Sequence, residues 1–171
     1  MEVTFIVDSN AGKLARWLRM MGYDTLFFND IDDGDLVNLA LREGRVVVTR
    51  DTQIAKRRVA VNGSLRVVLS RHDDPRQQLL QVVDELGLDC RQTQFTRCLE
   101  CNQRLVSRSK DEVKDLVPPY VFRTQTQYMQ CLSCSRIYWQ GTHWQRMKRS
   151  LEEITADSTG RAQGRDQTTA K

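Results

Sequence analysis

The sequence predicts an α/β fold: a three-layer domain built on a parallel sheet, followed by a small zinc ribbon. Two observations support this prediction. Short apolar runs alternate with helical segments over residues 3–89, which is typical of a parallel sheet covered by helices on both faces. Farther along, two CxxC pairs, Cys98/Cys101 and Cys131/Cys134, have the spacing of a four-thiolate metal site.

Four apolar runs are the predicted strands. Each is short, contains β-branched or aromatic residues and is almost continuously hydrophobic, as expected for strands buried on both faces. The runs are residues 3–7 (VTFIV), 25–28 (TLFF), 46–49 (VVVT) and 65–69 (LRVVL).

A helical segment follows each run. The first has an apolar stripe at helical spacing, and Gly22 ends it. Asp33 is a candidate N-cap for the second helix, which Gly44 ends, and a third helical stretch extends from Asp51 to about residue 63. The fourth begins near Pro75. The stripe of the first helix consists of Leu14, Trp17, Leu18 and Met21.

Acidic residues follow the predicted strands. Asp8 comes directly after the first and Asp51 soon after the third, while Asp33 and Asp35 begin the second helix. Sites in parallel sheets form at the carboxyl ends of the strands, so these acids are expected at one edge if the first and third strands are neighbours. Carboxylate oxygens suit Mg²⁺ or Mn²⁺. Asp33 and Asp51 are also plausible helix caps, and the Thr49 hydroxyl is expected to orient Asp51 or a metal-bound water.

The four paired cysteines, Cys98, Cys101, Cys131 and Cys134, predict a structural zinc site, because a two-residue gap lets one tight turn present two sulfurs to one ion. The alternative is two disulfides, which are rare in the intracellular setting that the rest of the sequence suggests. Cys90 lies outside both pairs and is expected to be a buried free thiol.

These patterns suggest four segments. They are an α/β domain (residues 1–92), a zinc ribbon (93–143), a short basic helix (144–155) and a disordered tail (156–171). Within the ribbon, residues 118–122 (PPYVF) are expected to lead into a strand. Tyr138 and Trp139 are expected either to stack on nucleic acid or to pack against the first domain, and packing is favoured for Trp139.

The charge is unevenly distributed. Residues 1–95 carry 13 Lys or Arg and 14 Asp or Glu, whereas residues 96–171 carry 13 and 8. A basic second half suits a polyanionic partner, although ordinary surface solvation accounts for it equally well. No segment approaches the roughly 20 apolar residues of a membrane span, and the N-terminus lacks a secretory pattern, so a cytoplasmic protein without a membrane partner is expected.

A set of short motifs runs through the chain: residues 5–8 (FIVD), 12–19 (GKLARWLR), 22–25 (GYDT), 32–36 (DDGDL), 44–51 (GRVVVTRD), the two CxxC pairs and 138–144 (YWQGTHW). Together they resemble the Mut-seven C-terminal RNase family, a PIN-like nuclease fold with an appended zinc ribbon. The resemblance covers about residues 3–147.

The resemblance implies a metal-dependent ribonuclease that hydrolyses RNA phosphodiester bonds, with a zinc ribbon that aids RNA binding. The family's acids correspond to Asp8, Asp33 and Asp51, with Asp35 as a fourth candidate. These acids would hold Mg²⁺ or Mn²⁺, whose bound water attacks phosphorus. Single-stranded RNA is the favoured partner; the oligomeric state is not predicted.

Three basic residues lie near the same edge and are candidates for backbone phosphate contacts: Lys13, Arg16 and Arg50. Their alternative role is a solvated helix surface. For the whole protein, the alternatives are a non-catalytic RNA- or ribosome-associated binding module of the same fold, and cleavage of DNA in place of RNA.

Overall fold

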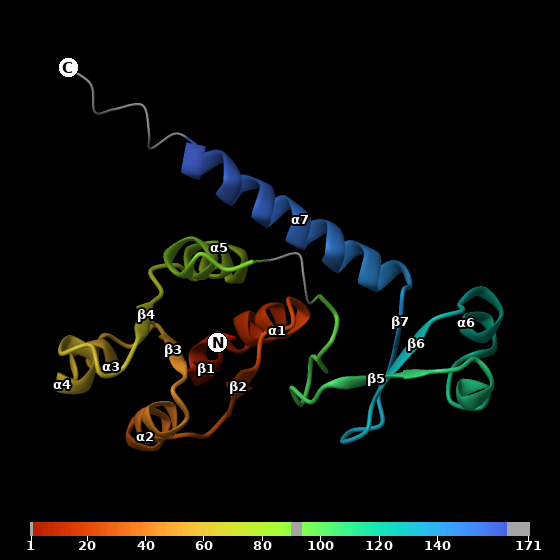
Figure 1. The fold of residues 1–171 in the computed structure, drawn as a ribbon, viewed down its shortest axis with the longest axis horizontal. Helices are drawn as coiled ribbons and strands as arrows, with labels where there is room; N and C mark the ends of the chain where they lie inside the picture. The colour runs from red at the N-terminus through yellow and green to blue at the C-terminus, as the bar shows by residue number, and fades with distance from the viewer. Residues whose placement is uncertain (1, 90–93, 164–171) are drawn as a thin grey trace. The chain divides into compact units, whose positions relative to one another are not determined.

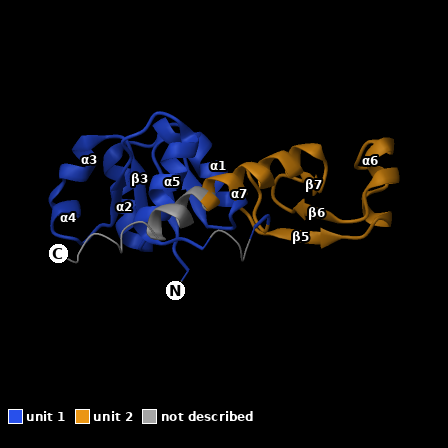
Figure 2. Ribbon diagram, turned by 90° about the horizontal axis from the view of Figure 1, so that it is seen from above, with its two compact units in different colours: residues 1–95 blue, residues 96–171 orange. Residues whose placement is uncertain are grey.

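The computed structural model describes residues 2–89 and 94–163. The chain divides into two units, Met1–Phe95 and Thr96–Lys171 (Figure 2). The first unit is a mixed α/β domain with a four-stranded parallel sheet, and the second contains a three-stranded antiparallel sheet. The predicted fold class, a parallel α/β domain followed by a cysteine-bearing ribbon, is therefore confirmed.

All four strands of the first sheet run parallel, in the order β2-β1-β3-β4. The predicted first and third strands are neighbours, and Val7 pairs with Val48 at their carboxyl ends. This register places the residues after both strands at the same edge of the sheet. The strands are β1 (Phe5–Val7), β2 (Thr25–Phe27), β3 (Val46–Thr49) and β4 (Val67–Leu69).

A helical segment follows each strand (Figure 1). The predicted single helix between Asp51 and residue 63 is wrong: it is split at Arg57, whose extended backbone (φ −60°, ψ 144°) interrupts the helical hydrogen bonds. Gly44 and Gly87 end their helices in the left-handed conformation that glycine adopts most readily. The helical segments are η1 (Ser9–Ala11), α1 (Gly12–Met20), α2 (Asp33–Glu43), α3 (Thr52–Lys56), α4 (Arg58–Val61) and α5 (Pro75–Leu86).

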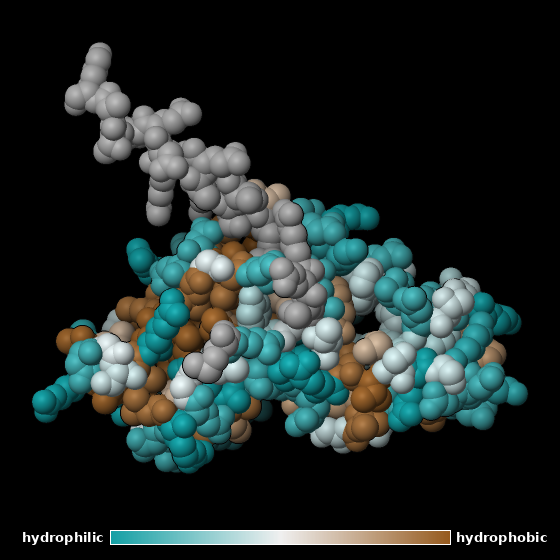
Figure 3. Space-filling view, viewed as in Figure 1, coloured by the Kyte–Doolittle hydropathy of each residue, from teal (hydrophilic) through white to brown (hydrophobic). Residues whose placement is uncertain are grey.

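Helices cover both faces of the parallel sheet. On one face, Ile6 and Val47 pack with residues of α2 and with Ile54 of α3. Because side chains alternate along a strand, their strand neighbours point to the opposite face, where α1 contacts β1 and β2 and packs against α5. In the view of Figure 3, hydrophilic residues cover the outside of α2, and hydrophobic residues gather over β3, β4 and α5.

Gly12 allows α1 to begin close to the end of β2. A Cβ atom at Gly12 would lie 2.7 Å from the Phe27 ring, which is closer than real Cβ contacts. The absence of a side chain at this position therefore lets the turn after β1 pack against the last residue of the neighbouring strand.

The second unit contains β5 (Leu105–Arg108), β6 (Tyr128–Cys131) and β7 (Ile137–Trp139), in that order. Its apolar core joins Val113, of the short helix η2 (Asp111–Val113), and Val121 to Tyr128, and Trp139 packs against this core. The strand expected from residues 118–122 is wrong. These residues form the start of α6 (Pro119–Thr124), because Pro119 at the first helical position has a favourable fixed φ and Val121 is buried in the core.

The C-terminal helix α7 (Thr142–Gln163) is longer than predicted. Residues 156–163, assigned from sequence to a disordered tail, belong to this helix, and residues 164–171 lie outside the described part of the chain. The low apolar content of this segment suggested that it is not buried and is therefore disordered. A segment can form a helix without being buried, and no proline interrupts this one. None of the described helices combines the length and hydrophobicity that a membrane span requires.

Candidate functional site

Each of the four parallel strands is followed by at least one aspartate, and after three of the strands one of these aspartates caps the next helix. Asp32, Asp51 and Asp74 each accept hydrogen bonds from the first backbone amides of α2, α3 and α5. Such N-caps satisfy amides that have no partner within the helix. Asp8, after β1, makes no side-chain cap. Helix formation therefore accounts for three of the four acids and not for Asp8.

Asp8 is a buried carboxylate surrounded by neutral donors. Its side chain accepts hydrogen bonds from Ser9 Oγ at 3.1 Å, Asn10 Nδ2 at 3.4 Å and Thr49 Oγ1 at 2.9 Å. Only 5% of the residue is exposed, and no cationic side chain of the described residues forms an ion pair with it. A buried charge without a counter-ion is costly, which makes Asp8 the acid most in need of a functional explanation.

Thr49 links the ends of β1 and β3. Its hydroxyl donates to Asp8 Oδ2 and accepts a hydrogen bond from the backbone N–H of Asp51 at 2.9 Å. The Thr49 side chain is fully buried, so these two bonds are shielded from water. The Thr49 hydroxyl bonds to the Asp51 backbone, as its expected role of orienting Asp51 requires. Its hydrogen bond to Asp8 was not expected from the sequence.

Asp51 is half-buried and uses one carboxylate oxygen, Oδ1, to cap α3 through the Gln53 amide at 2.7 Å. Its other oxygen accepts no hydrogen bond from the described residues. Asp51 therefore combines a structural cap with an oxygen that can bind a further group.

The cap of α2 is Asp32 and not Asp33, which corrects the sequence assignment. Asp32 Oδ1 accepts from the amides of Gly34 and Asp35 at 2.7 and 3.0 Å. Hydrogen bonds from the Asp35 and Gly34 amides lower the pKa of the exposed Asp32 carboxyl. Asp33 is the first residue of the helix; its carboxylate lies 4.0 Å from the Arg57 guanidinium, and Asp35 is exposed in the same turn.

The three basic candidates occupy exposed positions. Lys13 and Arg16 lie on α1, which begins beside Asp8. Arg50 follows β3, and its guanidinium pairs with the exposed carboxylate of Asp73, in the loop after β4. Contact between Arg50 and a phosphate would therefore replace an ion pair within the protein.

The carboxylates do not form a closed metal cage on their own. Over residues 2–89 and 94–163, the four paired cysteines are the only group of at least three His, Cys, Asp or Glu residues close enough to hold one ion. Asp8 and Asp51 are connected through Thr49, while Asp33 and Asp35 belong to the turn after the neighbouring strand β2. Any ion at this edge would need water or substrate oxygens to complete its coordination.

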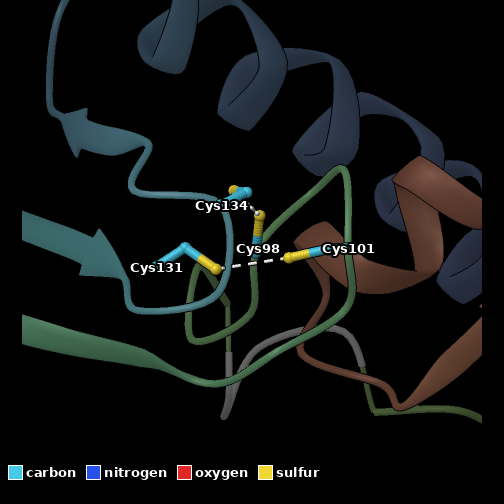
Figure 4. A group of neighbouring side chains, drawn as sticks. All are labelled: Cys98, Cys101, Cys131 and Cys134. Carbon is cyan, nitrogen blue, oxygen red and sulfur yellow. Dashed lines mark hydrogen bonds between the residues drawn. The ribbon is translucent and has the colours of Figure 1, made fainter.

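The four cysteine sulfurs converge in the second unit (Figure 4). All four lie within 4.8 Å of one another, with 3.6 Å between Cys98 and Cys134 and 3.2 Å between Cys101 and Cys131. Thiolates at tetrahedral positions around zinc are about 3.8 Å apart, given a Zn–S bond of about 2.3 Å. The thiols are free, so the cluster can bind zinc and the disulfide alternative is not what the structure contains.

The two cysteine turns, residues 98–101 and 131–134, share one backbone design. In each, the first cysteine's amide donates to the carbonyl five residues later, Cys98 to Gln103 at 2.8 Å and Cys131 to Arg136 at 2.9 Å. The residue after each second cysteine is left-handed, with φ of 68° at Asn102 and 61° at Ser135. This repeated geometry directs both sulfurs of each turn to one point.

Cys98 and Cys134 differ in their surroundings. Cys98 is fully buried and Cys134 is exposed. Burial raises the pKa of Cys98, but hydrogen bonds from the Tyr138 hydroxyl and from the amides of Cys101 and Glu100 outweigh it and lower the pKa to about 6. Burial raises the pKa of Cys134. The environment of Cys98 thus favours the thiolate that metal binding requires.

The chain matches the Mut7-C RNAse domain over residues 3–151, which is most of its length. The chain belongs to the Mut7-C RNAse domain family. No curated protein and no solved structure is similar enough to count as a match. Family membership confirms the predicted resemblance and indicates a nuclease-type function.

Sequence reasoning identified the acids but missed their immediate partners. Ser9 and Asn10, which bond to Asp8, follow it directly in the sequence, so their hydrogen-bonding side chains were a usable signal. Tyr138 bonds to Cys98 and Trp139 packs on the core of its own unit. Cys90, expected to be a free thiol, lies outside the described residues.

Proposed function

We propose that this Mut7-C RNAse domain protein is a metal-dependent ribonuclease that acts at the carboxyl edge of the parallel sheet, with Asp8 as its central acid. The observation that carries the proposal is the environment of Asp8. It is buried, caps no helix and is hydrogen-bonded only by neutral groups of the described chain. A divalent cation would supply the compensating charge that the protein does not.

The residues at this edge fit such an ion chemically. Asp8 and Asp51 would hold it from neighbouring strands, with Asp33 and Asp35 contributing from the start of α2. All are oxygen ligands, which Mg²⁺ and Mn²⁺ prefer. When bound, the ion supplies a water of lowered pKa and offsets the charge that develops on a phosphate under attack.

The protein's own residues would orient and bind the substrate. Thr49 and Ser9 hold the Asp8 carboxylate in one orientation through their hydroxyls. Lys13, Arg16 and Arg50 would contact RNA phosphates beside the acids, and the basic second unit would extend the contact along the strand. Single-stranded RNA is the proposed substrate. The four converging thiols, Cys98, Cys101, Cys131 and Cys134, would hold a structural zinc ion, and reduced thiols of this kind suit a cytoplasmic location.

The test is a cleavage assay of the purified full chain on labelled single-stranded RNA and on DNA of the same sequence, with Mg²⁺ or Mn²⁺. RNA cleavage is expected to require the ion and to fall to background in Asp8→Asn. The matched control is Asp84→Asn, an exposed aspartate on α5, which is expected to cleave at the wild-type rate.

The other outcomes are equally informative. RNA binding without cleavage would replace the ribonuclease by a binding module of the same fold. Preferred cleavage of DNA would change the substrate. Cleavage that persists in Asp8→Asn would remove Asp8 from the mechanism.

A further inference from the structure

We infer that Tyr138 is a positioning residue of the zinc site, whose hydroxyl holds Cys98 as a hydrogen-bonded thiolate and ties the two cysteine turns together. The inference rests on the proposed binding of zinc by Cys98, Cys101, Cys131 and Cys134. It concerns a residue outside both CxxC pairs, on strand β7.

The hydrogen bonds of the Tyr138 hydroxyl define its direction. Its oxygen lies 3.2 Å from the Leu99 backbone nitrogen, which can only donate, and 3.1 Å from Cys98 Sγ. The Tyr138 oxygen therefore accepts from the Leu99 N–H, and its single proton is available for one donated bond. A zinc-bound sulfur is a thiolate with no proton to donate, so in the zinc-bound site the Tyr138 hydroxyl donates to Cys98 Sγ.

The contact joins segments that are distant in the chain. Tyr138 follows the second cysteine turn, whereas Cys98 and Leu99 belong to the first, forty positions earlier. The register of β6 and β7 fixes the tyrosine, because Tyr138 pairs with Met129 two residues before Cys131. One hydroxyl thus connects the strands of the second turn to the ligand and the backbone of the first.

The burial of the cysteines explains why this bond matters most at Cys98. The Cys98 sulfur belongs to a fully buried residue, so water cannot replace a lost donor, whereas the exposed Cys134 can be hydrated. Groups that hydrogen-bond to metal ligands fix their orientation, and their loss typically weakens metal binding by about 10- to 100-fold. Zinc is therefore expected to be held most firmly at the Cys98 side.

The experiment measures the rate of zinc transfer from the full chain to a chromogenic chelator. Tyr138→Phe removes only the hydroxyl and is expected to release zinc about 10- to 100-fold faster than the wild type. The control is Tyr120→Phe, which removes a hydroxyl from an exposed tyrosine of α6 and is expected to leave the rate unchanged. Equal rates in Tyr138→Phe and the wild type would overturn the inference.

Hydrogen exchange provides an independent readout. In the zinc-loaded wild type, the Leu99 amide is expected to exchange slowly; rapid exchange would refute the Tyr138 contact even if the variant failed to fold. In Tyr138→Phe, Leu99 is expected to exchange faster, while the Asn102 amide, which donates to the Cys98 carbonyl at 3.0 Å, keeps its protection. Loss of protection at both amides would indicate that Tyr138→Phe unfolds. The exchange rate of the Leu99 amide in the wild type would then be the test of the Tyr138 contact.

Zinc content separates failure of this inference from failure of the site itself. The wild type and Cys90→Ser are each expected to contain one zinc per chain, and Cys98→Ser to lose it. A wild type without zinc would disprove the proposed zinc site. A wild type with zinc whose release is insensitive to Tyr138→Phe would disprove only the role of Tyr138.

Discussion

The hydroxyl of Thr49 donates a hydrogen bond of 2.9 Å to the Asp8 carboxylate across the paired strands β1 and β3. The same hydroxyl accepts the Asp51 amide, so one fully buried side chain sets the positions of two acids that are distant in sequence. The arrangement fixes the orientation of the Asp8 carboxylate without a cationic partner among the described residues.

Replacing Thr49 by valine is expected to destabilise the protein and to reduce RNA cleavage. Valine has the same shape but leaves the Asp51 amide without its partner and removes a donor from Asp8, which costs about 1–3 kcal/mol. Urea unfolding and the cleavage assay measure the two effects. Thr25→Val is the control, because Thr25 is a buried threonine at the opposite end of the sheet. Similar cleavage by the two variants would contradict the role given to Thr49.

Asp8→Asn is expected to be at least as stable as the wild type in the absence of Mg²⁺. The substitution removes a buried charge, and the Ser9 hydroxyl can turn to accept from the new amide. Added Mg²⁺ should then stabilise only the wild type, by about 2.7 kcal/mol at a concentration one hundred times its dissociation constant. Urea unfolding with and without Mg²⁺ measures this difference. Equal stabilisation of both proteins would place the ion elsewhere.

Asp32→Ala is expected to lower the stability of the first unit more than Asp33→Ala, because Asp32 is the cap of α2. The Asp35 and Gly34 amides lower the Asp32 pKa, so its contribution is present above the ordinary value of 3.8 and is lost as the pH falls through the lower folded-state value. Urea unfolding at neutral and acidic pH should therefore show the two proteins, wild type and Asp32→Ala, converging in acid. A larger loss in Asp33→Ala would restore the original assignment.

Asp73→Asn is expected to tighten RNA binding, because it frees the Arg50 guanidinium from its ion pair. Arg50→Ala should weaken binding and reduce the slope of log K against log salt concentration by about 0.7, the value for one phosphate contact on a single strand. Fluorescence anisotropy over a salt series measures both. If Asp73→Asn tightens binding as much in the Arg50→Ala background, the gain comes from general charge and not from Arg50.

Ser135→Gly is expected to stabilise the zinc-binding unit. Ser135 has a φ of 61°, a conformation that costs an L-residue about 1–2 kcal/mol. Glycine adopts this conformation without that cost, although its greater conformational freedom in the unfolded state offsets about 0.5–1 kcal/mol of the stabilisation. Ser133→Gly, on the other side of Cys134, offers no such relief and should be destabilising. Thermal unfolding of the zinc-loaded proteins compares them, and a loss of stability in both would show that the left-handed turn is not strained.

The positions of the strands and of Asp8 could be predicted because they depend on local and topological rules. Buried parallel strands are almost continuously hydrophobic. The expectation for the acids depended on the first and third strands being neighbours, and β1 and β3 do pair, which puts Asp8 and the start of α3 at one edge. The choice between Asp32 and Asp33 as a cap could not be predicted, since adjacent identical side chains carry the same propensity. The extended backbone of Asp32 (φ −77°, ψ 158°) decides it.

The second unit was less predictable because its core is small and formed by distant residues. Residues 118–122 contain valine and two aromatic residues, which favour a strand, but packing of Val121 against Tyr128 selects a helix. The Tyr138 contact with Cys98 depends on strand register, which a single sequence does not specify. The cysteine spacing, in contrast, depends on local turn geometry and was sufficient to locate the cluster.

The pairing of β1 with β3 has a consequence for protein synthesis. Ribosomes deliver Asp8 first, but its partner hydroxyl arrives only with Thr49, and neither can engage the other until both strands have left the exit tunnel. In the proposed ribonuclease, a nascent chain whose β3 is still in the tunnel would therefore be inert toward the messenger from which it is being translated. Chain topology alone would delay the onset of cutting at least until β3 has emerged and paired with β1.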